Sequence, residues 1–256
     1  MAALVGSIFI GSSAYAGLMS VFVVVGSMEF YRMLDEDKSL NIGKYYGIFV
    51  SIVVFLLIYL MGENLIPPHL LFSLAPLFFI SFILEIYRNT KNPIQNIALS
   101  LFPVFYLAIP LSLSSYMITY FQQDNPYILL GFFILIWTND TFAYLTGVTL
   151  GKHRLLERIS PKKSWEGFFG GLLFSLGMGI VLGQFFHELT QFQWAGMAVL
   201  ITLTGTYGDL AESMFKRSMN IKDSGKILPG HGGILDRFDG VIMAAPFVVL
   251  YLYFIS

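Results

Sequence analysis

The stretch "KDSGKILPGHGGILDRFDGVIMAAPFVVLYLYFIS", residues 222–256, joins a polar segment directly to an apolar one. Residues 222–240 contain three aspartates, three basic residues, one of the four histidines of the chain and five glycines. The apolar run that follows approaches the length of about 20 residues that spans a bilayer as a helix. The junction therefore predicts a membrane helix that begins at the end of a polar loop.

The composition of the whole chain agrees with this prediction. Of its 256 residues, 56% are hydrophobic and 12% are charged, whereas soluble domains carry about 25% charged residues. A soluble core could not bury so many long apolar runs, and the alternation in strands of about ten residues that marks a β-barrel is missing. The sequence predicts an all-α, polytopic integral membrane protein with one domain over residues 1–256.

Apolar runs and polar breaks predict about nine transmembrane helices. The first 33 residues are too long for one ordinary span, so we divide them at "GSS", residues 11–13. Residues 1–130 then form N-terminal helices, and residues 131–256 carry the helices and loops of the expected site. The predicted spans are 2–11, 14–33, 43–61, 70–87, 95–118, 126–149, 166–187, 193–212 and 240–256.

The basic residues test this layout. All 15 Lys and Arg residues lie in or beside every second loop, and the loops 62–69, 119–125 and 188–192 contain none. This is the positive-inside pattern, which predicts that the basic loops face the cytoplasm and that the C-terminus lies outside. A net charge of −1 gives no argument for nucleic acid, and the absence of cysteine excludes disulfides, a thiol nucleophile and Cys-based metal sites.

Polar residues gather on one face of the span that enters the polar loop. In "TYGDLAESMFKRS", residues 206–218, the side chains of Asp209, Glu212, Ser213 and Lys216 have the spacing i, i+3, i+4, i+7, which is one face of a helix. Charged residues within spans usually face a polar cavity. The alternative is a helix end that has already left the lipid and whose polar face is solvated.

The segment "LPGHGGILDRFDG", residues 228–240, adds further polar groups. Its glycines allow close approach of the backbone to a ligand. Asp236 and Asp239 are either favourable charges at a helix start or, together with Asp209, a site for a hard cation. Oxygen ligands without cysteine favour Mg²⁺ over zinc. His231 is a candidate metal ligand, a candidate hydrogen-bond donor to phosphate, or an ordinary loop histidine.

A second polar region lies in the preceding basic loop. Asp140 falls inside the predicted span 126–149, where an acidic residue is a candidate for function or for a structural hydrogen bond. In "ISPKKSWEGFFGG", residues 159–171, Lys162, Lys163 and Ser164 come just before a helix start, where lysines and free N–H groups bind anions. The alternative is ordinary positive-inside charge with Ser164 as a cap. Gly167 and Gly171 are typical of close helix packing.

At this point the sequence resembles a known family, the CDP-diacylglycerol synthases or phosphatidate cytidylyltransferases. The likeness is strongest in "SMFKRSMNIKDSGKILPGHGGILDRFD", residues 213–239, and extends through "NDTFAYLTGVTLGK" and "SPKKSWEG" over roughly residues 137–240. The matching positions are Ser213, Lys216, Arg217, Lys222, Asp223, His231, Gly232, Gly233, Asp236, Arg237 and Asp239.

The resemblance implies a nucleotidyltransferase of phospholipid biosynthesis that converts CTP and phosphatidic acid to CDP-diacylglycerol and diphosphate. It implies that the enzyme uses Mg²⁺, with two expected cation sites. It also implies a location in a bacterial inner membrane, where the substrates meet at the cytoplasmic face. Membrane lipids are expected partners, and a homodimer is left open. On this basis the expected metal ligands are Asp209, Asp236 and Asp239, with Asp140 and Glu212 as further candidates. The expected catalytic residues are Lys216, Arg217, Lys222, Asp223, His231 and Arg237, and the expected substrate contacts are Ser213, Gly232, Gly233, Lys163 and Ser164.

Three alternatives remain open from the sequence. A CTP-dependent lipid-alcohol kinase would transfer the γ-phosphoryl group and release CDP. An ion-coupled transporter would use Asp140 and Asp209 as intramembrane coupling sites, but it would need a path to the outer face. A scaffold protein would have no reason to gather these carboxylates. Outside the site, Glu29 with Arg32 and Glu85 with Arg88 are expected to be interfacial pairs.

Overall fold

The computed structural model describes residues 2–35, 39–119, 125–219, 221, 225 and 233–255, and these residues are almost entirely helical. In chain order, the helices are α1 (Ala2–Ile10), α2 (Ser12–Leu34), α3 (Lys44–Gly62), the 3₁₀ turn η1 (Pro68–Ser73), α4 (Leu74–Arg88), α5 (Pro93–Pro103), the π-helical turn η2 (Val104–Ala108), α6 (Ile109–Thr119), α7 (Pro126–Leu150), α8 (Trp165–Phe185), α9 (Gln191–Ser218) and α10 (Leu235–Ile255).

Each predicted span coincides with one helix or with one continuous helical stretch. Within the described residues, seven of these stretches are long and apolar enough to cross a membrane, and α5, η2 and α6 together form one of them, Pro93–Thr119. The remaining two are α1, which has 9 residues, and α9, which is less apolar. The prediction of an all-α polytopic membrane protein is confirmed.

Local sequence explains where the helices begin. Gly11 separates α1 from α2 with a φ of 131°, a conformation that glycine adopts without steric cost, so the break expected at residues 11–13 is confirmed. Pro126 opens α7, and the side chain of Asn125 caps it by accepting the N–H of Tyr127 at 2.9 Å. Thr190 and Gln193 form a reciprocal capping box at the start of α9, which satisfies free N–H groups.

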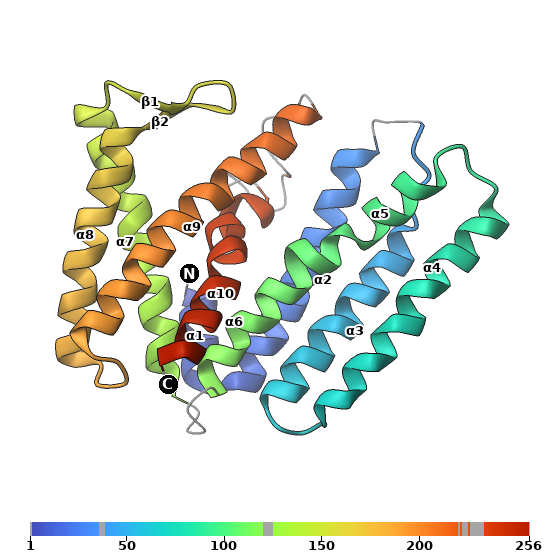
Figure 1. Ribbon diagram of the computed structural model, residues 1–256, viewed down its shortest axis with the longest axis horizontal. Helices are drawn as coiled ribbons and strands as arrows, with labels where there is room; N and C mark the ends of the chain where they lie inside the picture. The colour runs from blue at the N-terminus through green and yellow to red at the C-terminus, as the bar shows by residue number, and fades with distance from the viewer. Residues whose placement is uncertain are drawn as a thin grey trace.

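Within the described part of the chain, one short sheet interrupts the helices. Strands β1 (Arg154–Leu156) and β2 (Ser160–Ser164) form an antiparallel hairpin between α7 and α8, with Arg154 opposite Ser164 and Leu156 opposite Ser160. Figure 1 shows this hairpin above α7 and α8, at the same end of the molecule as the C-terminal end of α9.

The helices form two groups that meet at the centre of the molecule. In Figure 1, α7 and α8 lie side by side at the left, α9 and α10 cross in the middle, and α2 to α6 fill the right. Buried side chains of α2, α6, α7, α9 and α10 make one core, among them Tyr15, Leu111, Phe132, Trp194 and Val248. Helix α4 lies at the outer edge and buries only Ser81 and Glu85.

The described connections between the helices lie at two ends of the molecule. The hairpin, the connection after α4 and the C-terminal ends of α2 and α9 lie at one end in Figure 1, and the connections after α3 and α8 lie at the other. The basic residues of the described loops are therefore collected at one end of the helices. That this end faces the cytoplasm stays a prediction.

Candidate active site

The site begins with a close crossing of α9 and α10. Gly208 lies against the backbone of α10, where a Cβ atom would come within 2.5 Å of the carbonyl oxygen of Asp239. Nearby, a Cβ on Gly205 would be 3.9 Å from the Cα of Gly240. Because these glycines let the two backbones approach, the polar face of α9 lies directly against the first turns of α10.

Three carboxylates meet at this crossing. One oxygen from each of Asp209, Glu212 and Asp239 lies within 4.8 Å of the others. Glu212 is buried, and its Oε1 atom has no hydrogen-bond partner among the described residues. The second carboxyl oxygen of Glu212 accepts a hydrogen bond from Lys216 at 2.5 Å, and Asp239 Oδ1 accepts the N–H of Gly240 at 2.7 Å.

Lys216 links the two helices beside this cluster. Its ammonium group contacts Glu212 at 2.5 Å on α9 and Asp236 at 2.6 Å on α10, with 15% of its side chain exposed. Burial lowers the pKa of Lys216, but its hydrogen bonds with Asp236 and Glu212 outweigh that effect and hold the pKa above its ordinary value. Asp236 also accepts the N–H of Gly233 at 2.9 Å, so this carboxylate fixes the entry into α10 and lies beside both Lys216 and Glu212.

Helices α7 and α8 supply the opposite wall. Their packing relies on Gly167 and Gly171, where a Cβ would lie 2.8 Å from the carbonyl oxygen of Ala143 and 2.7 Å from Asn139 Oδ1, so the predicted packing role of these glycines is confirmed. Asp140 is exposed on the pocket side of α7 and accepts a hydrogen bond from Asn139 at 3.4 Å. The expected structural contact with Asn139 is therefore present, and it leaves the side chain open to the pocket.

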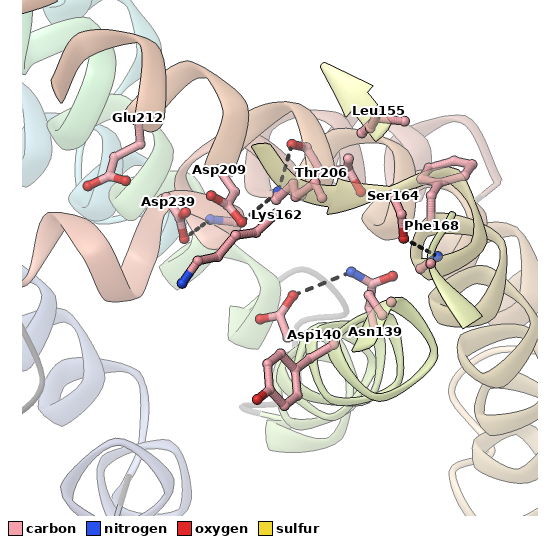
Figure 2. Close-up of a pocket in the computed structure, with 18 of the residues that line it drawn as sticks. Asn139, Asp140, Leu155, Lys162, Ser164, Phe168, Thr206, Asp209, Glu212 and Asp239 are labelled. Atoms are coloured by element: carbon pink, nitrogen blue, oxygen red, sulfur yellow. Dashed lines mark hydrogen bonds and ion pairs between the residues drawn. The ribbon is translucent and has the colours of Figure 1, made fainter. Parts of the chain in front are cut away.

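The segment before α8 connects this wall to α9. Lys163 contacts Asp209 at 2.5 Å and donates to the carbonyl oxygen of Thr206 at 3.4 Å. Ser164 is buried and caps α8 by accepting the N–H of Gly167 at 3.2 Å, so its predicted capping role is confirmed. Figure 2 shows Asp140 below and Asp209, Glu212 and Asp239 above the space that these contacts enclose.

The enclosed space is a pocket of about 650 Å³. Among the predicted site residues, eight line it: Asp140, Lys163, Ser164, Asp209, Glu212, Lys216, Asp236 and Asp239. Four others lie outside its lining, namely half-buried Ser213, buried Gly233 and the exposed Arg217 and Arg237. The remaining four, Lys222, Asp223, His231 and Gly232, lie outside the described residues.

The structure adds residues that sequence reasoning missed. Arg154, Asn139 and Thr206 also line the pocket, as does Lys162, which was expected as part of an anion site before α8. Glu29 of α2 is 1% exposed and accepts the N–H of Leu235, the first residue of α10, at 3.1 Å. The prediction that Glu29 forms an interfacial pair is therefore wrong. The sequence did carry a signal for a different role, because Glu29 is an acidic residue inside an apolar span and such residues are usually functional.

At the second expected interfacial pair, Glu85 is 5% exposed. It contacts Arg88 at 3.2 Å and also accepts a hydrogen bond from Asn96 at 2.8 Å. The pairing is confirmed, but Glu85 lies in a buried network of α4 and α5 instead of at an interface.

The carboxylate cluster has the chemistry of a Mg²⁺ site. Magnesium is bound in proteins by one or two carboxylates together with water and substrate phosphates. Asp209, Glu212 and Asp239 supply three carboxylates at one point, and the buried Oε1 of Glu212 lacks a partner among the described residues. The residues present therefore fit a hard divalent cation, and the neighbouring Lys163 and Lys216 add the positive charge that phosphates require.

Fold and site together define a class of protein: a polytopic helical membrane protein with a pocket of carboxylates and cations at the basic end of its helices. The sequence model of one family, the cytidylyltransferase family, matches residues 1–255. The chain belongs to this family.

Curated relatives carry the name phosphatidate cytidylyltransferase. The protein of Staphylococcus aureus strain COL is 35% identical over 227 residues, which are 86% of this chain and 85% of the relative. The protein of Staphylococcus epidermidis strain RP62A is 47% identical over 133 residues, 51% of this chain and 50% of the relative. The protein of Staphylococcus haemolyticus is 46% identical over 133 residues. The chain thus spans about half the length of the last two relatives.

Proposed function

We propose that this protein is a phosphatidate cytidylyltransferase. It joins CTP to phosphatidic acid, forms CDP-diacylglycerol and releases diphosphate. The observation that carries the proposal is the pocket between α7, α8, α9 and α10, where three carboxylates lie within 4.8 Å of one another beside Lys163 and Lys216. Family membership and the names of the relatives support the choice of substrates.

The reaction brings two polyanions together, so the work of the protein is charge neutralisation and alignment. Asp209, Glu212 and Asp239 are the residues that would hold Mg²⁺, and a bound Mg²⁺ would neutralise phosphate charge. Asp140 on α7 and Asp236 on α10 line the same pocket and are further candidate ligands. A second cation site remains part of the proposal.

Lys163 and Lys216 bind phosphate oxygens in this proposal. Both ammonium groups are already fixed by carboxylates, since Lys163 contacts Asp209 and Lys216 contacts Glu212 and Asp236. Fixed cations need little reorganisation when the charge on the phosphates changes. No covalent enzyme intermediate is required, because a phosphate oxygen of the lipid is the nucleophile.

The pocket lies at the end of the helices that carries the basic loops. Phosphatidic acid keeps its acyl chains in the bilayer and places its phosphate at the surface, where a water-soluble nucleotide can reach it. The proposed location is the inner membrane of a bacterium, with the pocket open to the cytoplasm. The basic ends of the helices support this orientation through the positive-inside rule.

The test uses purified protein in detergent with phosphatidic acid, Mg²⁺ and CTP labelled either at the α- or at the γ-phosphate. We expect the α-label to enter the lipid and the γ-label to appear in diphosphate, in equal amounts. A lipid-alcohol kinase would instead place the γ-label on a lipid and release CDP. An absence of α-labelled lipid, or the appearance of γ-labelled lipid, would overturn the proposal.

A further inference from the structure

The hairpin of β1 and β2 forms a basic wall of the pocket. Arg154 on β1 and Lys162 on β2 both line it and are both exposed. Figure 2 shows the Lys162 side chain extended into the pocket. The carboxylates of α9 and α10 line the same pocket, so its lining combines acidic groups from these helices with basic groups from the hairpin.

These two cations differ from the other two in the pocket. Lys163 and Lys216 each contact a carboxylate at 2.5 Å. Among the residues that the structure describes, no ion pair forms between a carboxylate and Arg154 or Lys162. No carboxylate of the described residues therefore offsets the charge of Arg154 and Lys162, whereas Lys163 and Lys216 are each already paired with a carboxylate.

The base of the hairpin is held in place. The N–H of Trp165 donates to the carbonyl oxygen of His153 at 2.9 Å, and His153 Nδ1 lies 2.6 Å from Glu166 Oε1. The guanidinium of Arg154 reaches the carbonyl oxygen of Lys162 at 3.5 Å. These contacts tie β1 and β2 to the first turn of α8, so the two cationic side chains start from fixed backbone positions.

We propose that Arg154 and Lys162 bind the β- and γ-phosphates of the nucleotide, the part that leaves as diphosphate. The inference rests on the proposed function and assigns an orientation to the nucleotide within the pocket. The reacting α-phosphate lies toward the carboxylates of α9 and α10, and the triphosphate tail extends toward the hairpin. Arg donates hydrogen bonds to two phosphate oxygens at once and Lys acts as a point charge.

The chemistry of the step explains why cations are needed there. An oxygen of the lipid phosphate forms a bond to the α-phosphorus, and the bond from that phosphorus to the bridging oxygen of the β-phosphate breaks. The electron pair of the broken bond stays on the departing diphosphate, so negative charge grows on the tail. Arg154 and Lys162 stabilise this charge as it develops.

The experiment compares Arg154→Ala and Lys162→Ala with matched controls on the same hairpin and its base. Arg158→Ala and Lys152→Ala remove exposed cations that do not line the pocket. Steady-state rates are measured on full-length protein while CTP and phosphatidic acid are varied separately. Binding of inorganic pyrophosphate, with Mg²⁺ present, is measured by calorimetry on the same samples without turnover.

We expect each pocket variant to raise the KM for CTP and the Kd for pyrophosphate by about 10- to 100-fold, the range for a lost hydrogen bond to a charged group. In the pocket variants, the KM for phosphatidic acid should change by less than about twofold. In both control variants, the two KM values and the Kd for pyrophosphate should each change by less than about twofold. Lys162→Arg should keep most of the affinity for pyrophosphate that Lys162→Ala loses.

An unchanged Kd for pyrophosphate would overturn the inference, as would a rise confined to the KM for phosphatidic acid. Because pyrophosphate binding does not need turnover, its loss in the variants supports the basic wall even if the wild-type protein fails to make a cytidine lipid. That failure would count against the proposed function alone.

Discussion

Glu212 directs one carboxyl oxygen to Lys216 at 2.5 Å and keeps the other buried without a hydrogen-bond partner among the described residues. A buried anionic oxygen without a partner is costly, and a divalent cation shared with Asp209 and Asp239 would satisfy it. The position of this one atom is the reason to treat the cluster as a metal site and not as a patch of surface acids.

Glu212→Gln removes the charge of this oxygen and preserves the shape of the side chain. We expect the Mg²⁺ concentration for half-maximal activity to rise by about tenfold or more, because even partners of metal ligands contribute 10- to 100-fold to metal affinity. Binding of Mn²⁺, followed by electron paramagnetic resonance, should weaken in parallel. Glu157→Gln, an exposed acid at the hairpin outside the pocket, is the control, and equal behaviour of the two variants would refute the metal assignment.

Lys216 makes a separate prediction about stability. Lys216→Met leaves Glu212 and Asp236 without their shared cation, and breaking a buried ion pair costs about 3–5 kcal/mol. The midpoint of thermal unfolding should fall clearly. Lys44→Met is the matched control, because its pair with Asp35 is exposed, at 38% and 52% of the two side chains, and contributes at most about 1 kcal/mol. Similar midpoints for both variants would show that Lys216 does not join α9 to α10.

At the scale of the elements, the site depends on how closely α9 and α10 approach. Gly208→Ala places a Cβ within 2.5 Å of the carbonyl oxygen of Asp239, so the helices must move apart and the three carboxylates must separate. We expect loss of most of the activity together with a lower unfolding temperature.

Gly177→Ala on α8 is the control for this prediction. A Cβ there meets nothing within 4 Å, and alanine is the better helix former by about 1 kcal/mol. This variant should keep its activity and should unfold at the same or a higher temperature. If Gly208→Ala behaves in the same way, then the close crossing is not required for the site.

The elements also show what a sequence can and cannot reveal. The helices follow from run length and composition, and the stripe of Asp209, Glu212 and Lys216 follows from helical spacing along one segment. The contact of Glu29 with Leu235 bridges 206 positions, so it depends on how α2 packs against α10, which no local pattern encodes. Strand β1 has only 3 residues, too few to show alternation, so the segment was predicted only as a basic loop.

The spacing of residues along the sequence also could not predict which side chains contact one another. Asp236 and Asp239 were expected in one metal site with Asp209. In the structure, Asp209, Glu212 and Asp239 each bring one oxygen within 4.8 Å of the others, and Asp236 interacts with both Lys216 and Glu212 beside them. The two aspartates are three positions apart in the first turns of α10, and their contacts with α9 depend on how the two helices pack together, which spacing along one helix does not encode.

At the scale of the whole molecule, the proposed reaction requires the basic end of the helices to face the cytoplasm. The chain contains no cysteine, so single cysteines can be introduced into an otherwise unreactive background. Glu157→Cys, at the basic end, should be shielded from a membrane-impermeant maleimide in intact cells and should react in inverted vesicles. Leu65→Cys, 68% exposed in the connection after α3, should show the reverse, and the opposite pattern would invert the orientation.

We propose that cytidylyl transfer takes place at the carboxylates between α9 and α10. The most direct test is diphosphate release coupled to formation of a cytidine lipid, measured with CTP, phosphatidic acid and Mg²⁺ for the wild-type protein and for Asp239→Asn. We predict equal amounts of both products from the wild-type protein and a rate at least about a thousandfold lower from the variant, as for loss of a strong transition-state electrostatic contact. Turnover by Asp239→Asn at the wild-type rate, in protein that binds and inserts normally, would contradict the account.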